Sequence, residues 1–220
     1  MKFLKKIKLK EKVYGVVDGV AQLLVVQQAT LHGKLVYVAR DDARMAQMQQ
    51  GLAALDPELN IQLLPAWDCL PYDRVPPHPG IISQRIHTLS NLYGMADSIA
   101  SLTTQPKNSI LLTTINSWMQ KVPPRSFFEK NTLTLRVGNE MAPKAITDFL
   151  ARNGFIRTQT VREFGEFSLR GGILDVFASS LTPPVRLDFF GDEIESIKLF
   201  DSLSQRSESQ IQHVDIRPAH

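Results

Sequence analysis

The hydrophobic pattern of this chain changes at Pro123-Pro124, and that change constrains the fold more than any other feature. Before it, short apolar runs alternate with segments of helical periodicity; after it, strand-like segments that alternate apolar and polar residues follow one another closely. The first pattern is typical of a mostly parallel sheet covered by helices, and the second of a mixed or antiparallel sheet. The sequence therefore predicts an α/β domain followed by a smaller α+β domain.

In the first part, three short apolar runs are expected to be buried strands: Leu35–Ala39, Ile61–Leu64 and Ile110–Thr113. The helices between them have recognisable ends and faces. Asp18 is expected to cap a helix that runs toward Leu31, and Asp41 to cap the next one. The apolar faces of the second and third helices are expected at Met45, Met48, Leu52 and Leu55, and at Ile82, Ile86, Leu89 and Tyr93. The five prolines from Pro65 to Pro79 predict an ordered loop that crosses the sheet edge.

The second part begins with a strand at Thr132–Arg136 and one helix. Pro143 suits the first turn of that helix, Ile146, Phe149 and Leu150 form its apolar face, and Gly154 ends it. Four further strands are expected at Phe167–Arg170, Ile173–Phe177, Val185–Phe190 and Glu193–Phe200. Gly191-Asp192 between the last two favours a tight hairpin turn.

The basic character of the chain is concentrated in its first twelve residues. Six lysines against Glu11 give this segment a charge of +5; since the whole chain carries +3, the other 208 residues carry −2. Such a run is more often a solvated tail than a DNA-binding arm. No apolar run is long enough to span a bilayer, and the first residues lack the core of a signal peptide, so a cytoplasmic protein without membrane contact is expected.

The residue patterns of catalytic and metal sites are missing from the sequence. A phosphate-binding loop needs a lysine and a hydroxyl residue, whereas Gly15–Ala21 has neither and carries Asp18, so its glycines are expected to serve a tight turn. Cys69 is the one cysteine and is expected to be structural, and the histidines show no ligand spacing. The acids Asp188, Asp192, Glu193 and Glu195 are expected to form a solvated rim. No catalytic, metal or cofactor site is therefore predicted.

Two sequence stretches are much more specific. The first is Leu64-Pro-Ala-Trp-Asp-Cys-Leu-Pro-Tyr-Asp-Arg74 with Pro77–Arg85, and the second is Phe164–Phe177 with Val185–Ile197 and Phe200-Asp201. In order and spacing they resemble the N-terminal module of the transcription-repair coupling factors and, more distantly, the excision-repair helicase UvrB. The resemblance runs from about Gly15 to the last residues.

The resemblance implies a division of the chain and a fold for each part. It implies a basic tail at 1–12 and a degenerate helicase-like (P-loop-type) α/β domain at 13–130. A UvrA-binding domain at 131–210 and the start of a return segment at 211–220 would follow.

For function, the resemblance implies a non-catalytic module that docks UvrA and so brings this repair protein to stalled RNA polymerase. RNA polymerase and DNA would be bound by absent parts of a longer protein, and ATP and Mg²⁺ by its translocase. Compared with UvrB, Gly15–Ala21 lacks an intact phosphate loop, and the proline-rich loop around Tyr72 stands where UvrB has a DNA-clamping hairpin. The alternatives are a DNA-binding remnant of a UvrB-like helicase and a still active nucleotide hydrolase.

Arg170, Arg186 and Phe190 match the positions by which the family contacts UvrA. Arg186 and Phe190 are four residues apart on one expected strand, so their side chains emerge on the same face. Arginines beside an aromatic residue are typical of interface hot spots. The alternative is that both arginines pair with Glu166, Asp175 or Asp188 within the sheet, and that Phe190 belongs to the core.

Overall fold

The computed structural model describes residues 13–69, 74–93, 108–179, 181 and 183–219. Within these ranges the chain is a mixed α/β protein that forms two compact units. Unit 1 comprises residues 1–66 and 105–120, and unit 2 comprises residues 67–104 and 121–220. The bounds of these compact units differ from the domain boundaries expected at 130/131 and 210/211. The expected domain boundaries stay predictions. The expected basic tail at 1–12 and Tyr72 lie outside the described residues.

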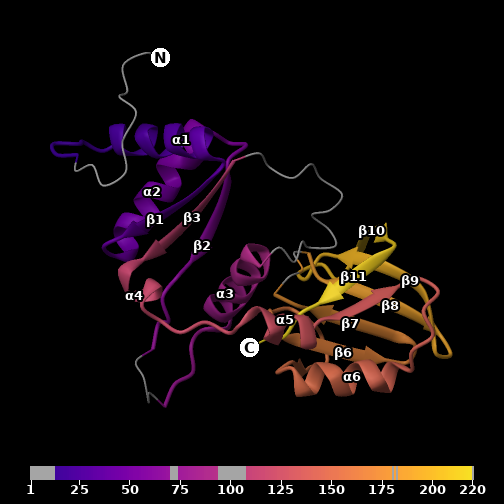
Figure 1. Cartoon of the computed structure of the whole chain (residues 1–220). Helices are drawn as coiled ribbons and strands as arrows, with labels where there is room; N and C mark the ends of the chain where they lie inside the picture. The colour runs from indigo at the N-terminus through magenta and orange to yellow at the C-terminus, as the bar shows by residue number, and fades with distance from the viewer. Residues whose placement is uncertain (1–12, 70–73, 94–107, 180, 182, 220) are drawn as a thin grey trace. The chain divides into compact units, whose positions relative to one another are not determined.

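Unit 1 is built on a three-stranded parallel sheet in the order β1-β3-β2. Its elements are α1 (Val20–His32), β1 (Lys34–Ala39), α2 (Asp42–Leu55), β2 (Asn60–Leu64), β3 (Ser109–Thr114) and α4 (Ile115–Trp118). Leu52 of α2 and Ala29 of α1 are buried with Ile110 and Leu112 of β3, so both helices pack on one face of the sheet (Figure 1). The three strands that the sequence predicts here, and their parallel arrangement, are confirmed.

The start of α1 differs from the sequence prediction. Gly19, not Asp18, is the N-cap residue; its positive φ of 87° turns the chain into the helix, and its N–H donates to Oε1 of Gln22 over 2.6 Å. The Asp18 carboxylate turns instead to α2, where it lies 2.6 Å from an Arg44 nitrogen and accepts a hydrogen bond from Gln47. An ion pair with a neighbouring helix has thus replaced the local cap. The expected cap of α2 is confirmed, because Asp41 accepts a hydrogen bond from the Arg44 N–H.

Unit 2 contains three helices and two antiparallel or mixed sheets among its described residues. The helices are α3 (Pro79–Leu92), α5 (Arg125–Lys130) and α6 (Pro143–Arg152). The six-stranded sheet has the order β10-β9-β8-β7-β6-β5. Its strands are β5 (Ile156–Arg157), β6 (Glu166–Arg170), β7 (Ile173–Phe177), β8 (Val185–Phe190), β9 (Glu193–Phe200) and β10 (Ser207–Ile211). Only the pair of β5 with β6 is parallel in this sheet, so the expected mixed sheet is confirmed.

A two-stranded ribbon completes unit 2. In it, β4 (Leu133–Arg136) pairs antiparallel with β11 (His213–Ile216). Leu135 of β4 and Val214 of β11 are fully buried in the same cluster as Ile146 and Leu150 of α6. This cluster also contains Leu174, Leu187 and Ile197 from the six-stranded sheet, so the ribbon and α6 cover one face of that sheet. We call this face the core face; α6 lies along it beside β6 (Figure 1).

Two glycines shape the turns that end the central strands. Gly191, at a φ of 63°, and Asp192 form the expected two-residue hairpin turn between β8 and β9. Gly172, in the turn from β6 to β7, accepts a 2.8 Å hydrogen bond from the Phe189 N–H. A Cβ at Gly172 would lie 2.9 Å from the Phe189 carbonyl oxygen. Glycine is therefore required where β7 approaches β8 next to Phe190.

Candidate functional site

The second face of the six-stranded sheet carries the three residues predicted to dock a partner. Since side chains alternate along a strand, the neighbours of the buried Leu174, Leu187 and Ile197 point away from the core face. They include charged side chains of the adjacent strands β7, β8 and β9, and Arg170 of β6 lies on the same side. We call this the charged face and define it by Arg170, Asp175, Arg186, Asp188 and Lys198.

Asp175 of β7 is the centre of the charged face. Its side chain is almost completely buried, and the β7 register places it opposite Arg186 of β8. Arg186 binds it with two parallel bonds, from Nε to Oδ1 over 2.7 Å and from Nη2 to Oδ2 over 3.0 Å. Arg170 donates a third bond from Nη2 to Oδ2 over 3.2 Å. Two guanidinium groups thus share one carboxylate, which leaves a net positive charge on the surface.

Arg186 is held on several sides. Its Nη1 donates to the carbonyl oxygen of Gln205 over 3.2 Å and to Oγ of Ser207 over 3.4 Å. The guanidinium carbon also lies 4.8 Å from the centre of the Phe200 ring, a distance suited to a cation–π contact. Hydrogen bonding to Asp175 raises the pKa of Arg186 against the opposing effect of burial. Only 16% of this side chain is exposed, whereas 54% of the Arg170 side chain is.

Asp188, next along β8, belongs to a second ionic cluster on the same face. Its Oδ2 accepts 2.6 Å bonds from Nζ of Lys198 and from Oγ of Ser196. Burial by itself would raise the pKa of Asp188, but the hydrogen bonds from Lys198 and Ser196 outweigh it and hold the pKa below its ordinary value. This acid is therefore an ionised partner of Lys198, and not part of the solvated rim that the sequence predicts.

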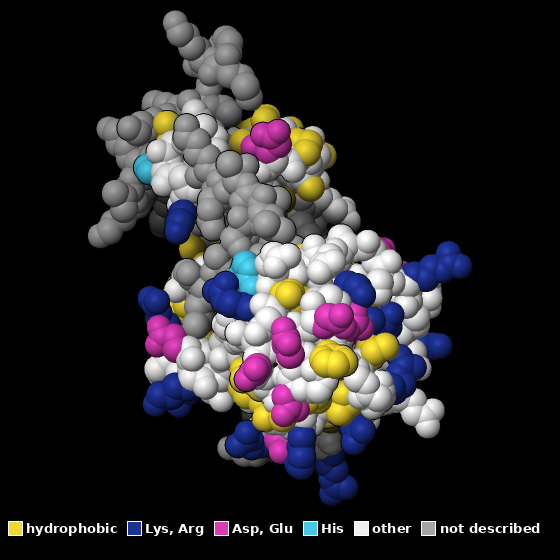
Figure 2. All heavy atoms as spheres, turned by 90° about the vertical axis from the view of Figure 1, so that its right-hand side faces the viewer, with side chains coloured by type: hydrophobic (Ala, Val, Ile, Leu, Met, Phe, Trp, Pro, Cys, Tyr) yellow, Lys and Arg dark blue, Asp and Glu magenta, His cyan; other side chains and the backbone are white. Residues whose placement is uncertain are grey.

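Phe190 ends β8 with 80% of its surface exposed. It follows Arg186 and Asp188 at even spacing, so it lies on the charged face. Figure 2 shows acidic, basic and a few hydrophobic side chains interspersed on the side of unit 2 that faces the viewer. The ion pairs considered as an alternative are thus present through Asp175, whereas the alternative that Phe190 belongs to the core is wrong. Binding of a partner by Arg170, Arg186 and Phe190 stays a prediction.

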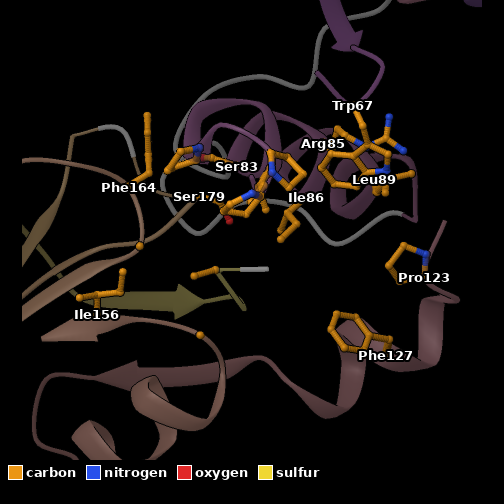
Figure 3. Close-up of a pocket in the computed structure, with 17 residues that line it drawn as sticks. Trp67, Ser83, Arg85, Ile86, Leu89, Pro123, Phe127, Ile156, Phe164 and Ser179 are labelled. Atoms are coloured by element: carbon orange, nitrogen blue, oxygen red, sulfur yellow. The ribbon is translucent and has the colours of Figure 1, made fainter. Parts of the chain in front are cut away.

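An apolar cavity that the sequence did not predict lies elsewhere in unit 2. It has a volume of about 580 Å³ and is lined by α3 residues such as Ile86 and Leu89, with Pro123 and Phe127 opposite them (Figure 3). Arg85 is the one charged residue among the described residues of the cavity wall, and its guanidinium carbon lies 4.2 Å from the centre of the Trp67 ring. Burial lowers the pKa of Arg85. Among the described residues that line this cavity no acid or histidine accompanies Arg85, so these residues contain no pair of groups for acid–base catalysis.

In the described ranges of the chain, no three His, Cys, Asp or Glu side chains gather closely enough to hold a metal ion. No described helix combines the length and apolar character that crossing a bilayer requires. Cys69 is half-buried and forms no disulfide.

Comparison with known proteins identifies the region that carries the charged face. Residues 133–220 match the family model of the UvrB interaction domain. The transcription-repair-coupling factor of Escherichia coli K12 is 32% identical over 212 residues, which cover 96% of this chain and 17% of the relative. The same-named protein of Haemophilus influenzae is 32% identical over 95% of this chain and 17% of the relative. The same-named protein of Rickettsia bellii is 31% identical over 84% of this chain and 16% of the relative. The chain thus spans about a sixth of the length of these relatives.

Proposed function

Because the chain belongs to the transcription-repair coupling factor family and carries a UvrB interaction domain, we propose that it is a non-catalytic docking module for the repair protein UvrA. The observation that carries the proposal is the exposure of Phe190 on a face with two arginines, inside the matched residues 133–220. An exposed phenylalanine gains free energy when a partner removes it from water. The half-exposed guanidinium group of Arg170 on the same face adds directional hydrogen bonds, as in interface hot spots.

The wider role that we propose is that of the N-terminal part of a coupling factor, which brings UvrA to stalled RNA polymerase. In this proposal, RNA polymerase and DNA are bound by other parts of the longer protein, and ATP and Mg²⁺ by its translocase. The first α/β region is then a degenerate helicase-like domain without a cofactor. Asp18 supports this, because its carboxylate stands in the glycine segment where a phosphate group would have to bind and is paired with Arg44.

The direct test measures the affinity of the 220-residue chain for purified UvrA. Phe190→Ala and Arg170→Ala should each weaken binding about thirty-fold, which corresponds to about 2 kcal/mol. Matched controls are Met119→Ala, which removes a side chain from a residue that is 78% exposed in unit 1, and Arg125→Ala, which removes an arginine that is 62% exposed. Both controls should bind UvrA as the unchanged chain does.

Two outcomes would contradict the proposal. Equal UvrA affinity of the unchanged chain and of both Phe190→Ala and Arg170→Ala would remove the charged face from the interface. Tight binding of duplex DNA that falls steeply with salt, and persists without residues 1–12, would favour the helicase-remnant alternative, because phosphate contacts release counterions.

A further inference from the structure

The guanidinium of Arg186 is already used by the fold. It binds Asp175 through two nitrogens and the Gln205 carbonyl and Ser207 hydroxyl through the third, and its central carbon lies over the Phe200 ring. A partner could take the N–H groups of Nε and Nη2 that bond Asp175 only by breaking bonds to a buried carboxylate, and those of Nη1 only by displacing Gln205 and Ser207. Such a carboxylate is costly to leave without its counter-charge. Arg186 is therefore poorly placed to form the interface itself.

Arg170 has the opposite character. Its side chain is half-exposed, and its one bond within the described part of the chain is the 3.2 Å contact from Nη2 to Asp175. The same carboxylate receives both arginines, so the strength of its bond to Arg186 determines how strongly it draws Arg170 to the sheet. If Arg186 were removed, Arg170 would be the remaining counter-charge of Asp175 and would be drawn inward.

Ile173 lies between Arg170 and Phe190, the two exposed residues that are candidates for partner contact. It is 40% exposed, lies directly opposite Arg170 on the neighbouring strand, and is opposite Asp188 on its other side. Phe190 is two residues beyond Asp188 on the same face, so Ile173 and Phe190 are diagonal neighbours, about 7 Å apart and within reach of an aromatic ring. Arg170, Ile173 and Phe190 therefore form one continuous exposed patch.

We propose that Arg170, Ile173 and Phe190 make the contact with the partner, and that Arg186 is a positioning residue that acts through Asp175. This division of roles rests on the proposed function, since UvrA is the partner that the patch would meet. It assigns a partner contact to Ile173, and to Arg186 the task of limiting how strongly the Asp175 carboxylate draws Arg170 inward.

A double-substitution cycle on UvrA affinity tests the role of Arg186, at a temperature where melting curves show every variant to be folded. Arg186→Ala alone should weaken binding about tenfold. In an Asp175→Asn background no carboxylate remains to draw Arg170 inward, so adding Arg186→Ala should change the affinity by no more than about twofold. A further tenfold loss in that background would show direct contact by Arg186 and overturn the assignment.

Arg186→Lys gives a second decision that does not depend on whether Asp175→Asn folds. A lysine keeps a positive charge opposite Asp175, so it should retain affinity within about threefold of the unchanged chain. An equal loss in folded Arg186→Lys and Arg186→Ala would overturn the positioning role. A purely structural role would also fail here, because it would change the melting temperature and leave the affinity of the folded variants unchanged.

Ile173→Ala should weaken UvrA binding about fivefold, as loss of an apolar contact beside a hot spot does. Unchanged affinity of this variant would exclude Ile173 from the patch. These failures are distinct from failure of the proposed function. If Phe190→Ala and Arg170→Ala lose affinity while the Arg186 cycle is additive, only the division of roles is overturned.

Discussion

The core face and the charged face of the six-stranded sheet are made from alternate residues of the same strands, but different forces act on them. On the core face, Leu174, Leu187 and Ile197 are completely buried beneath α6 and the β4–β11 ribbon. On the charged face, the charged side chains of adjacent strands form hydrogen bonds and ion pairs that largely balance their loss of hydration. The core face therefore determines whether the sheet folds, while the exposed part of the charged face is open to recognition at little cost to stability. Three predictions test this contrast.

The largest effect is expected on the core face. Leu187→Ala should lower the free energy of unfolding by about 3 kcal/mol, because it removes buried methyl groups and leaves a cavity. Urea denaturation followed by far-UV circular dichroism measures this loss. A decrease below about 1 kcal/mol would mean that the core face collapses around the smaller side chain, and the contrast between the faces would weaken.

A smaller effect that depends on pH is expected from Asp188. Because the folded-state pKa of Asp188 lies below the ordinary value of 3.8, its stabilising contribution is complete above that value and is lost as the pH falls through the folded pKa. At neutral pH the unchanged chain should exceed Asp188→Asn by about 1 kcal/mol in unfolding free energy. Denaturation of both proteins in parallel down to acidic pH measures the difference, which should shrink toward zero. If the difference in unfolding free energy stayed constant with pH, the stabilisation by Asp188 would not come from its charge.

The smallest effect on stability is expected at Phe190. Phe190→Ala removes a side chain that is already mostly in water, so the free energy of unfolding should change by no more than about 0.5 kcal/mol. The measurement is the same urea titration, with Leu187→Ala as its reference on the same strand. A loss as large as that of Leu187→Ala would show that Phe190 is packed, and would return it to the core.

Local patterns predicted much of this fold. The strands β1, β2 and β3 and the strands β6 to β9 appear where the alternation or the apolar runs placed them. Five described elements, α4, α5, β5, β10 and β11, are not predicted by the sequence, and three of them show the physical reason. The β10 strand, Ser207–Ile211, is polar and has no apolar alternation; β5 has two residues; and α5 has six residues after Pro124. The wrong cap at Asp18 has another cause, since its partner Arg44 lies on a different helix.

The candidate site shows the same limit. Strand parity was enough to place Arg186 and Phe190 on one face, because that depends on a single strand. The sharing of Asp175 between Arg170 and Arg186 depends on the registers of β6, β7 and β8 together. The sequence alone does not distinguish Asp175 from Glu166 and Asp188 as the partner of the two arginines. The apolar cavity was missed altogether, because its wall combines residues from α3 with distant ones such as Phe127 and Ile156.

The β4–β11 ribbon also has a consequence for biosynthesis. Leu133 pairs with Ile216, so the first strand of the interaction region waits for a partner that leaves the ribosome some 80 residues later. At elongation rates of about 5 to 20 residues per second this delay is about 4 to 16 s, far longer than hairpins such as β8–β9 need to form. During that interval the apolar side of β4 and part of the sheet lack their cover, and a chaperone has time to bind them. Folding of this region on the ribosome is thus timed by translation, and is completed when its last strand closes the loop.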